Sequence, residues 1–289
     1  MGWSALRAAP GAPPGIVLPN PIRHLSHRID LLIRYRELLG LLIVQSLALR
    51  YRHTILGFVW SLVSPVVTMA IMAVVFQFVI RIDMAHYTVF LFSAMLPWSF
   101  FAATLAESSL SIIHKQDLIT RQPIPKIVLP LSMAGANMVN LLLSVLVLMG
   151  LVGPQLGVFP SAAWIYLPLG FVCLFAFSVG LGAILAVITV YLRDVHQIVT
   201  VILPAWMYAS PVLYPLELPN GRAIIPVDYQ DYFKMNPIYW ILQLFVRPIY
   251  WGRAPSSTEV GLAIGISASV LVAGLAFFWW KEDDLVFHL

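Results

Sequence analysis

The sequence predicts an all-α membrane protein with six transmembrane helices, and three observations support this fold class. Of 289 residues, 60% are hydrophobic and only 10% are charged, whereas soluble domains carry about 25% charged residues. The mean hydropathy is +0.88, and no soluble core of this length buries so much apolar surface. The apolar residues also form uncharged runs of about 20, the length that crosses a bilayer. A soluble enzyme, a disordered chain and a nucleic-acid-binding module are therefore excluded.

The expected elements follow in chain order. Residues 1–28 are expected to form a flexible cytoplasmic tail, 55–280 the transmembrane domain, and 281–289 a second cytoplasmic tail. The six predicted transmembrane helices cover 55–80, 87–106, 127–152, 162–192, 198–214 and 260–280. In the last of these, Gly261 and Gly265 have the spacing of a small-residue packing face, either within the chain or across a dimer.

The distribution of Lys and Arg predicts the orientation of these helices. An even number of spans places both termini on one side, and that side carries twelve of the 17 Lys and Arg residues. Cytoplasmic loops are enriched in these residues. We therefore expect both termini in the cytoplasm, with a long outer loop between the fifth and sixth spans.

Residues 29–54 precede the first span and are predicted to form an amphipathic helix in the membrane interface. Their uncharged run, 38–49, is too short to cross the bilayer. Arginines at both ends keep their charged groups in water while the apolar body enters the lipid. These arginines are Arg34, Arg36, Arg50 and Arg52. The alternative is a poorly formed additional span.

The outer loop contains a second unusual segment, 237–246, which is apolar and aromatic but only about ten residues long. This length is typical of a re-entrant or interfacial helix. Its aromatic residues are Tyr239, Trp240 and Phe245.

Several kinds of chemistry are missing from the sequence. There is no P-loop motif, so the chain itself is expected to bind no nucleotide. The predicted spans hold no ionisable group at mid-depth, where an ion-coupled transporter needs one. His24 and His27 lack a third ligand nearby, and Cys173 is the only cysteine. We predict neither metal-ligating nor catalytic residues. Because the chain has neither a nucleotide-binding motif nor an ion-coupling site, we interpret it as a subunit of a complex whose energy comes from another subunit.

Aromatic residues are frequent in and near the predicted spans. Aromatic faces stack on the apolar faces of sugar rings, so a channel lined in this way would let a polysaccharide slide. The alternatives are a lipid-facing belt or core packing. The candidate channel-lining residues are Trp60, Phe76, Trp98, Phe100, Phe101, Trp206, Tyr208 and Tyr214.

The loop between the second and third spans, 111–126, has apolar and charged residues on opposite faces and is predicted to be a short amphipathic helix that stops at Pro123. Such a helix suits a groove on a partner protein. The alternative is a surface loop that lies on lipid headgroups.

Five stretches together resemble a known family. They are R-Y-R-H-T-I-L-G-F-V-W-S-L-V-S-P (50–65), M-L-P-W-S-F-F (95–101), Y-L-R-D-V (191–195), S-P-V-L-Y (210–214) and N-P-I-Y (236–239). In this order, they resemble the permease subunit of ABC-2-type exporters for cell-surface polymers. The resemblance covers about residues 28–280.

The resemblance implies a homodimer in a bacterial cytoplasmic membrane, with two copies of a separate ATPase subunit that binds ATP and Mg. It implies an undecaprenyl-type lipid-linked substrate: O-antigen, capsular polysaccharide or teichoic acid. Segment 111–126 would be the coupling helix, and 191–195 a second contact with the ATPase. The re-entrant segment with Tyr239, Trp240 and Phe245 would form the outer gate. The residues implied in coupling are His114, Lys115, Asp117, Leu118, Thr120, Arg121, Arg193 and Asp194.

Two other functions remain open. An ABC-2 exporter of a small lipid or drug would share this architecture. A membrane-embedded glycosyl- or acyltransferase would need an outer base, for which Asp228 and Asp231 are the candidates. Because the predicted spans hold no basic residue, a neutral or mildly acidic glycan is favoured over a teichoic acid.

Overall fold

The computed structural model describes residues 33–52, 59–75, 84, 86–121, 124–147, 149–150, 160–216, 225–282 and 284–285. Within these ranges every regular element is a helix and no strand occurs. The chain divides into two units, Met1–Glu37 and Leu38–Leu289. The helix bundle is built by the second unit, which is the one described below.

Four helices among the described residues are long and apolar enough to cross a membrane. They are α4 (Tyr87–His114), α6 (Val128–Val147), α8 (Leu167–Tyr191, preceded by the 3-10 helix η4 at Ala162–Tyr166) and α12 (Ser257–Lys281). They correspond to the second, third, fourth and sixth predicted spans. The all-α class is therefore confirmed, and four helices that overlap predicted spans are long and apolar enough to cross a membrane; the count of six spans stays a prediction.

The other two predicted spans are shorter where they are described. Helix α3 covers Trp60–Val74, and the remaining parts of the span predicted over 55–80 lie outside the described residues. Helix α9 covers Val195–Tyr208, whereas 198–214 was predicted. At 14 residues, α9 is about 21 Å long, below the hydrocarbon thickness of about 30 Å. After α9 the chain turns through 209–216, where Pro211 lacks the N–H that a helix needs.

Helix α4 extends beyond its predicted end. The prediction ended at residue 106, before Glu107, but the helix continues to His114 without a break. Residues 111–114 of the predicted coupling helix therefore belong to α4, and a separate helix, α5 (Gln116–Arg121), follows after one turn residue. Residue 106 marks only the end of an uncharged run, and the helix continues because Glu is a good helix former; the charge of Glu107 is paired with Arg50.

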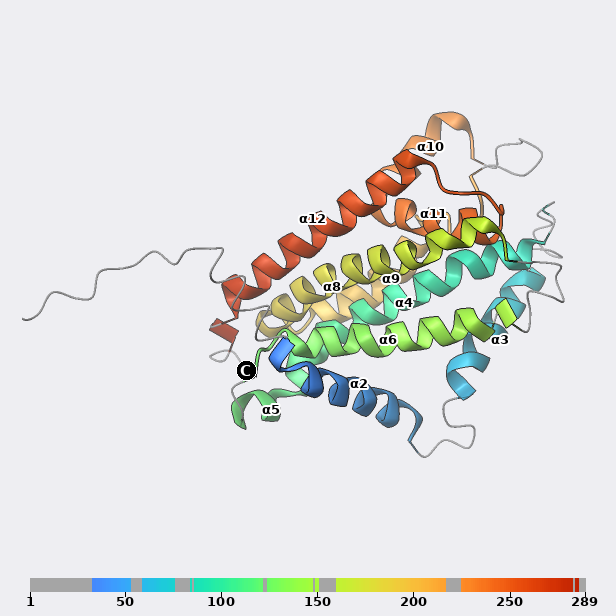
Figure 1. The fold of residues 1–289 in the computed structure, drawn as a ribbon. Helices are drawn as coiled ribbons and strands as arrows, with labels where there is room; N and C mark the ends of the chain where they lie inside the picture. Colours follow the sequence, from blue (N-terminus) through green and yellow to red (C-terminus); the bar gives the residue numbers. More distant parts are fainter. Residues whose placement is uncertain are drawn as a thin grey trace, which may run out of the picture. The chain divides into compact units, whose positions relative to one another are not determined.

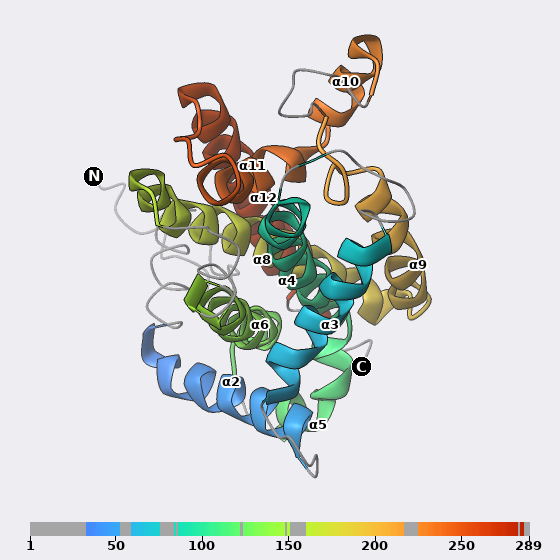
Figure 2. The same ribbon diagram turned by 90° about the vertical axis from the view of Figure 1, so that its right-hand side faces the viewer.

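The core of the bundle lies around α8, which packs against both α4 and α12 (Figures 1 and 2). The fully buried Phe101, Phe177 and Phe278 come from these three helices. Where α8 crosses α12, Gly180 faces Gly274 with backbone against backbone. Gly261 and Gly265 have nothing within 4 Å of an added Cβ, so they do not form a packing face within the described chain.

Two short helices, α10 (Val227–Lys234) and α11 (Pro237–Ile249), precede α12. The side chain of Asn236 caps α11 by accepting a hydrogen bond from the N–H of Ile238 at 3.3 Å. Helix α12 begins with a capping box, in which Ser256 and Glu259 exchange side-chain-to-backbone bonds. Helix α11 packs against α4, α8 and α12, so it is an integral part of the bundle.

Figure 1 shows which elements meet at each end of the helices. At one end lie α5, the end of α4, the start of α6, the turn between α8 and α9 and the end of α12. We call this the α5 end. At the other lie α10, α11, the turn 209–216 and the start of α4, which we call the α11 end. The loops and the end of α12 that the sequence assigns to the cytoplasm thus gather at the α5 end.

Candidate functional site

A closed polar network joins three helices near the α5 end. Arg50 of α2 (Arg36–Tyr51) pairs through Nη2 with Glu107 Oε1 of α4 at 2.5 Å. Arg50 Nη1 donates to Asn137 Oδ1 of α6 at 3.1 Å, and Asn137 Nδ2 donates to Glu107 Oε2 at 3.0 Å. Each side chain thus contacts the other two. The network fixes how α2 lies against α4 and α6.

A second contact joins α2 to the turn between α4 and α5. Lys115 Nζ donates to Gln45 Oε1 at 3.0 Å. The predicted interface residue Arg50 and the predicted coupling residue Lys115 are therefore linked through the same helix. The other predicted interface arginines make no such link: Arg34 and Arg36 lie in the first unit, and Arg52 is an exposed residue after α2.

Helix α5 has the two faces that the sequence predicted. Ile119 is buried and Leu118 half-buried, whereas Asp117 and Thr120 are exposed. The Thr120 hydroxyl donates to the carbonyls of Gln116 and Asp117, which ties it to its own helix. His114, at the end of α4, is exposed as well. The side chain of the remaining predicted residue of this segment, Arg121, lies outside the described residues.

Arg193 and Asp194 are exposed in the turn between α8 and α9, at the same end as α5 (Figure 1). Two contacts nearby connect segments distant in sequence. Lys126 Nζ donates to the carbonyl of Glu282 at 2.8 Å, and Ser109 Oγ lies 2.9 Å from His196 Nδ1. The α5 end is therefore a surface of mixed charge to which all four long helices contribute. Hydrogen bonds there join segments that are distant in sequence.

The predicted channel aromatics divide into buried and exposed groups. Trp98, Phe100 and Phe101 are 4%, 3% and 0% exposed. Phe101 packs on Phe177 and Trp206, with ring centroids 5.6 and 5.3 Å apart. These residues belong to the core between α4, α8 and α9, which is the packing alternative that the sequence left open. Their apolarity alone does not distinguish a core face from a channel face.

The remaining channel candidates lie nearer the surface. Trp60 and Tyr208 are 46% and 57% exposed, and both are available to face a channel or lipid. Tyr214 is half-buried and donates its hydroxyl to the carbonyl of Tyr208 at 2.5 Å. Phe76 lies outside the described residues.

The predicted outer-gate residues are anchored in the bundle. Phe245 is fully buried and packs against Phe171 of α8, with ring centroids 5.2 Å apart. Tyr239 is 8% exposed, and Trp240 donates its indole N–H to the carbonyl of Lys234 at 2.8 Å. These side chains hold α10 and α11 in place rather than projecting freely from them.

The structure also brings two of the recognised sequence stretches together. Asn236, from N-P-I-Y, accepts a hydrogen bond from Trp206 Nε1 at 3.1 Å and donates to Ser210 Oγ, from S-P-V-L-Y, at 2.7 Å. The same turn is bound to α4 because the Tyr87 hydroxyl donates to the carbonyl of Leu213 at 2.5 Å. Asn236 therefore joins α9, the turn 209–216 and α11.

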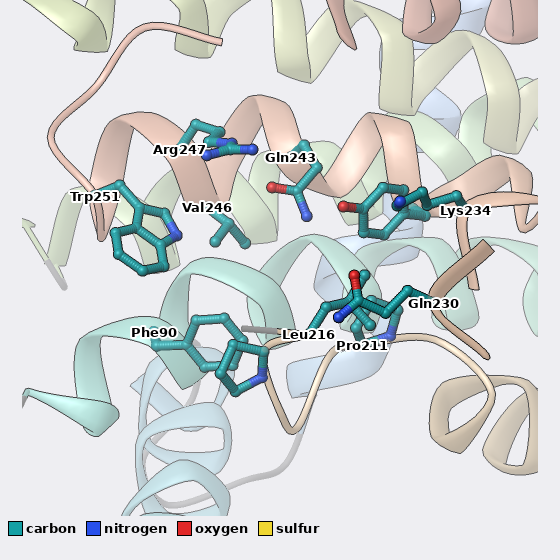
Figure 3. Close-up of a pocket in the computed structure, with 11 residues that line it drawn as sticks. Phe90, Pro211, Leu216, Gln230, Lys234, Gln243, Val246, Arg247 and Trp251 are labelled. Carbon is teal, nitrogen blue, oxygen red and sulfur yellow. The ribbon is translucent and has the colours of Figure 1, made fainter. Parts of the chain in front are cut away.

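A pocket of about 180 Å³ opens at the α11 end, between α11, α10, the start of α4 and the turn 209–216 (Figure 3). Its lining includes Gln243, Arg247 and Trp251. Sequence reasoning missed this pocket, because its residues come from four separate segments. Next to the pocket, the ring of Tyr250 packs edge-on against the ring of Phe90, with centroids 5.7 Å apart. Burial raises the pKa of the Tyr250 hydroxyl, so this group stays protonated at neutral pH.

No group of three His, Cys, Asp or Glu side chains suited to a metal ion occurs among the residues that the structure describes. The fold defines a helical membrane protein with several helices long and apolar enough to span a bilayer.

Comparison with known proteins narrows this class. The family "ABC-2 type transporter" matches residues 37–250. The chain is 30% identical over 256 residues to the O-antigen export system permease protein RfbA of Myxococcus xanthus, covering 88% of this chain and 95% of that protein. A protein of the same name from Klebsiella pneumoniae is 25% identical over 243 residues, covering 84% and 91%. The polysialic acid transport protein KpsM of Escherichia coli is 20% identical over 247 residues, covering 85% and 93%.

This chain therefore belongs to the ABC-2 type transporter family, as its sequence stretches suggested. Sequence reasoning named the segment of α5 and the turn 193–194 as contacts with the ATPase, which stays a prediction, and it missed the polar contacts of Gln45, Asn137 and His196. Asn137 carried a usable signal, because a buried amide within an apolar run needs hydrogen-bond partners.

Proposed function

We propose that this chain is the membrane subunit of an ABC transporter that exports a lipid-linked cell-surface polysaccharide. The observation that carries the proposal is the similarity along nearly the whole chain to permeases named for O-antigen export and polysialic acid transport. Those names favour a polysaccharide over a teichoic acid. Within the four long described helices, basic residues occur only at the last position of α4 (His114) and of α12 (Lys281), which also favours a neutral or mildly acidic chain.

The chain itself is not an enzyme in this proposal. ATP and Mg are bound by a separate ATPase subunit, present in two copies beside a homodimer of this chain. The ATPase docks at the α5 end, on the exposed Asp117 and Thr120 and on the turn with Arg193 and Asp194. This end then faces the cytoplasm of a bacterium, in agreement with the bias of Lys and Arg, and both termini lie on that side.

Helix α4 is suited to carry a movement from the ATPase to the far side of the membrane. Its 28 residues form a rod of about 42 Å that starts at the α11 end and finishes beside α5. At the α5 end it is held to α2 and α6 through Glu107, and at the α11 end it packs against α11. A displacement of α5 therefore reaches the segment that was predicted to gate the outer exit.

The proposal is tested in the native bacterium by deleting this gene and restoring it. Deletion should remove the polysaccharide from the surface while its lipid-linked form accumulates inside the cell. Purification in mild detergent should also yield an ABC ATPase in about one-to-one ratio with this chain. Normal surface polysaccharide after deletion would contradict the proposal.

The other two candidates give different results in the same strain. A small-lipid or drug exporter would leave the polysaccharide in place and change the efflux of a hydrophobic dye. If the chain is a transferase, the purified chain should transfer the polymer without any ATPase. The double variant Asp228→Asn with Asp231→Asn should abolish this transfer.

A further inference from the structure

The pocket at the α11 end has a lining unlike that of the surrounding core. Trp251, Phe90 and Val246 supply apolar surface, while Gln243 and Arg247 supply polar groups. In Figure 3 the amide of Gln243 and the guanidinium of Arg247 lie on α11, above Phe90 and the turn 209–216, with the indole ring of Trp251 at one side. Apolar and hydrogen-bonding groups thus face the same small volume.

The charges at this pocket are already balanced by neighbouring carboxylates. Arg247 donates through Nε and Nη2 to Glu259 Oε1, at 3.1 and 2.9 Å, and Glu259 is only 6% exposed. Lys234 pairs with Asp231 at 3.0 Å. A phosphate or carboxylate ligand gains most from an uncompensated cation. The pairing with Asp231 and Glu259 therefore argues against an anion as the ligand.

The hydrogen-bonding groups nonetheless suit an uncharged polar ligand. The bonds to Glu259 use two of the five N–H groups of Arg247. Gln230 donates one amide N–H to the carbonyl of Ile225 at 3.2 Å, and the amide of Gln243 supplies further donor and acceptor sites at the pocket. Sugar hydroxyl groups need both kinds of partner, and the flat ring of Trp251 offers an apolar face to the C–H side of a sugar.

The size and supports of the pocket limit its occupant. At about 180 Å³ it is smaller than the roughly 300–1,000 Å³ of pockets that hold drug-sized ligands. One wall, the turn 209–216, is held by Tyr87 and Asn236, and the opposite wall is the buried helix α11. A site of this volume with fixed walls accepts one sugar ring of a longer chain.

From these observations we infer that the pocket between α11 and the turn 209–216 binds a neutral sugar unit of the exported polysaccharide, with Trp251 as the ring platform and Gln243 and Arg247 as hydrogen-bonding partners. The inference deepens the proposed function and rests on it for the identity of the ligand. The site would hold the chain at the face opposite α5, so that the emerging polymer is retained between successive movements of α4.

The test measures binding of the polysaccharide released from the host's lipopolysaccharide by mild acid, using the full chain purified with its ATPase. Saturation-transfer NMR should detect contact of the sugar protons with the wild-type complex. Trp251→Ala and Gln243→Ala should each weaken binding about three- to tenfold, the range that follows for loss of an aromatic contact or a hydrogen bond. Added inorganic phosphate should not displace the polysaccharide.

Two control variants match the test variants in residue type but lie at the α5 end. Trp280 is 71% exposed and Gln197 is exposed, so Trp280→Ala and Gln197→Ala should leave binding unchanged. The melting temperature of each variant verifies folding. If Trp251→Ala unfolds, Trp251→Phe, which keeps an aromatic face, should bind nearly as well as the wild type.

Equal binding by all variants would overturn the inference, as would displacement by phosphate, which would identify an anion site. Failure of the proposed function is recognised separately by the deletion strain. If deletion removes the surface polysaccharide but binding is independent of Trp251 and Gln243, only the pocket inference is wrong. If deletion leaves the polysaccharide in place, the proposed function fails, and the pocket inference fails with it.

Discussion

The crossing of α8 and α12 makes a sharp prediction about Gly274. A Cβ atom at this position would lie closest to the carbonyl oxygen of Gly180, and 2.6 Å from its carbonyl carbon and 2.7 Å from its Cα. Ordinary van der Waals contact begins near 3.4 Å, so the two backbones must separate by roughly 0.8 Å or more. Because the obstructing atoms are backbone, no side-chain rotation relieves the clash.

We expect Gly274→Ala to destabilise the protein by about 3 kcal/mol, at the upper end of the range for overpacked cores. The measurement is unfolding by SDS in mixed micelles, followed by tryptophan fluorescence. Gly265→Ala in the same helix is the matched control, because nothing lies within 4 Å of a Cβ there. It should be neutral or more stable, since Ala is favoured over Gly by about 1 kcal/mol within a helix. Equal stability of the two variants would refute the close crossing.

Three further predictions concern the other parts of the bundle. Arg50→Ala should cost about 1 kcal/mol of stability, because the lost pair is half-exposed, and should speed amide exchange in α2 as measured by mass spectrometry; unchanged exchange would exclude the network as the anchor of α2. Asp117→Ala or Arg193→Ala should lower export while ATP hydrolysis continues, as measured by surface polysaccharide and phosphate release; unchanged export in both variants would exclude this docking face. Phe101→Ala should cost about 3–5 kcal/mol as a core truncation, whereas Tyr208→Ala, at 57% exposure, should leave the unfolding midpoint unchanged; a neutral Phe101→Ala would argue against core packing.

The membrane class could be derived from the sequence because it depends on local composition. An uncharged run of sufficient length crosses a bilayer whatever its neighbours are, since every backbone polar group is satisfied within the helix. The predicted runs therefore overlap α4, α6, α8 and α12, although α4 continues past residue 106 to His114. The amphipathic character of α5 is equally local, because residues three and four apart share a helix face.

The error at the end of α4 shows where local reasoning stops. Glu107 is a charge that interrupts an apolar run, and by itself it predicts the end of the membrane-spanning run. It is tolerated because Arg50 and Asn137, which are distant in sequence, satisfy its oxygens. The partner that neutralises a charge is a property of packing, and no window of sequence contains it.

The sequence by itself thus determined that this chain is a multi-spanning α-helical membrane protein that carries an amphipathic segment at one end. Only the tertiary structure decided which residues face one another. It placed Phe101 in the core, paired Gly274 with Gly180, and assembled the pocket around Gln243 and Trp251 from separate segments. Hydrophobicity is a property of each residue, whereas contacts depend on how helices far apart in the chain are rotated against each other.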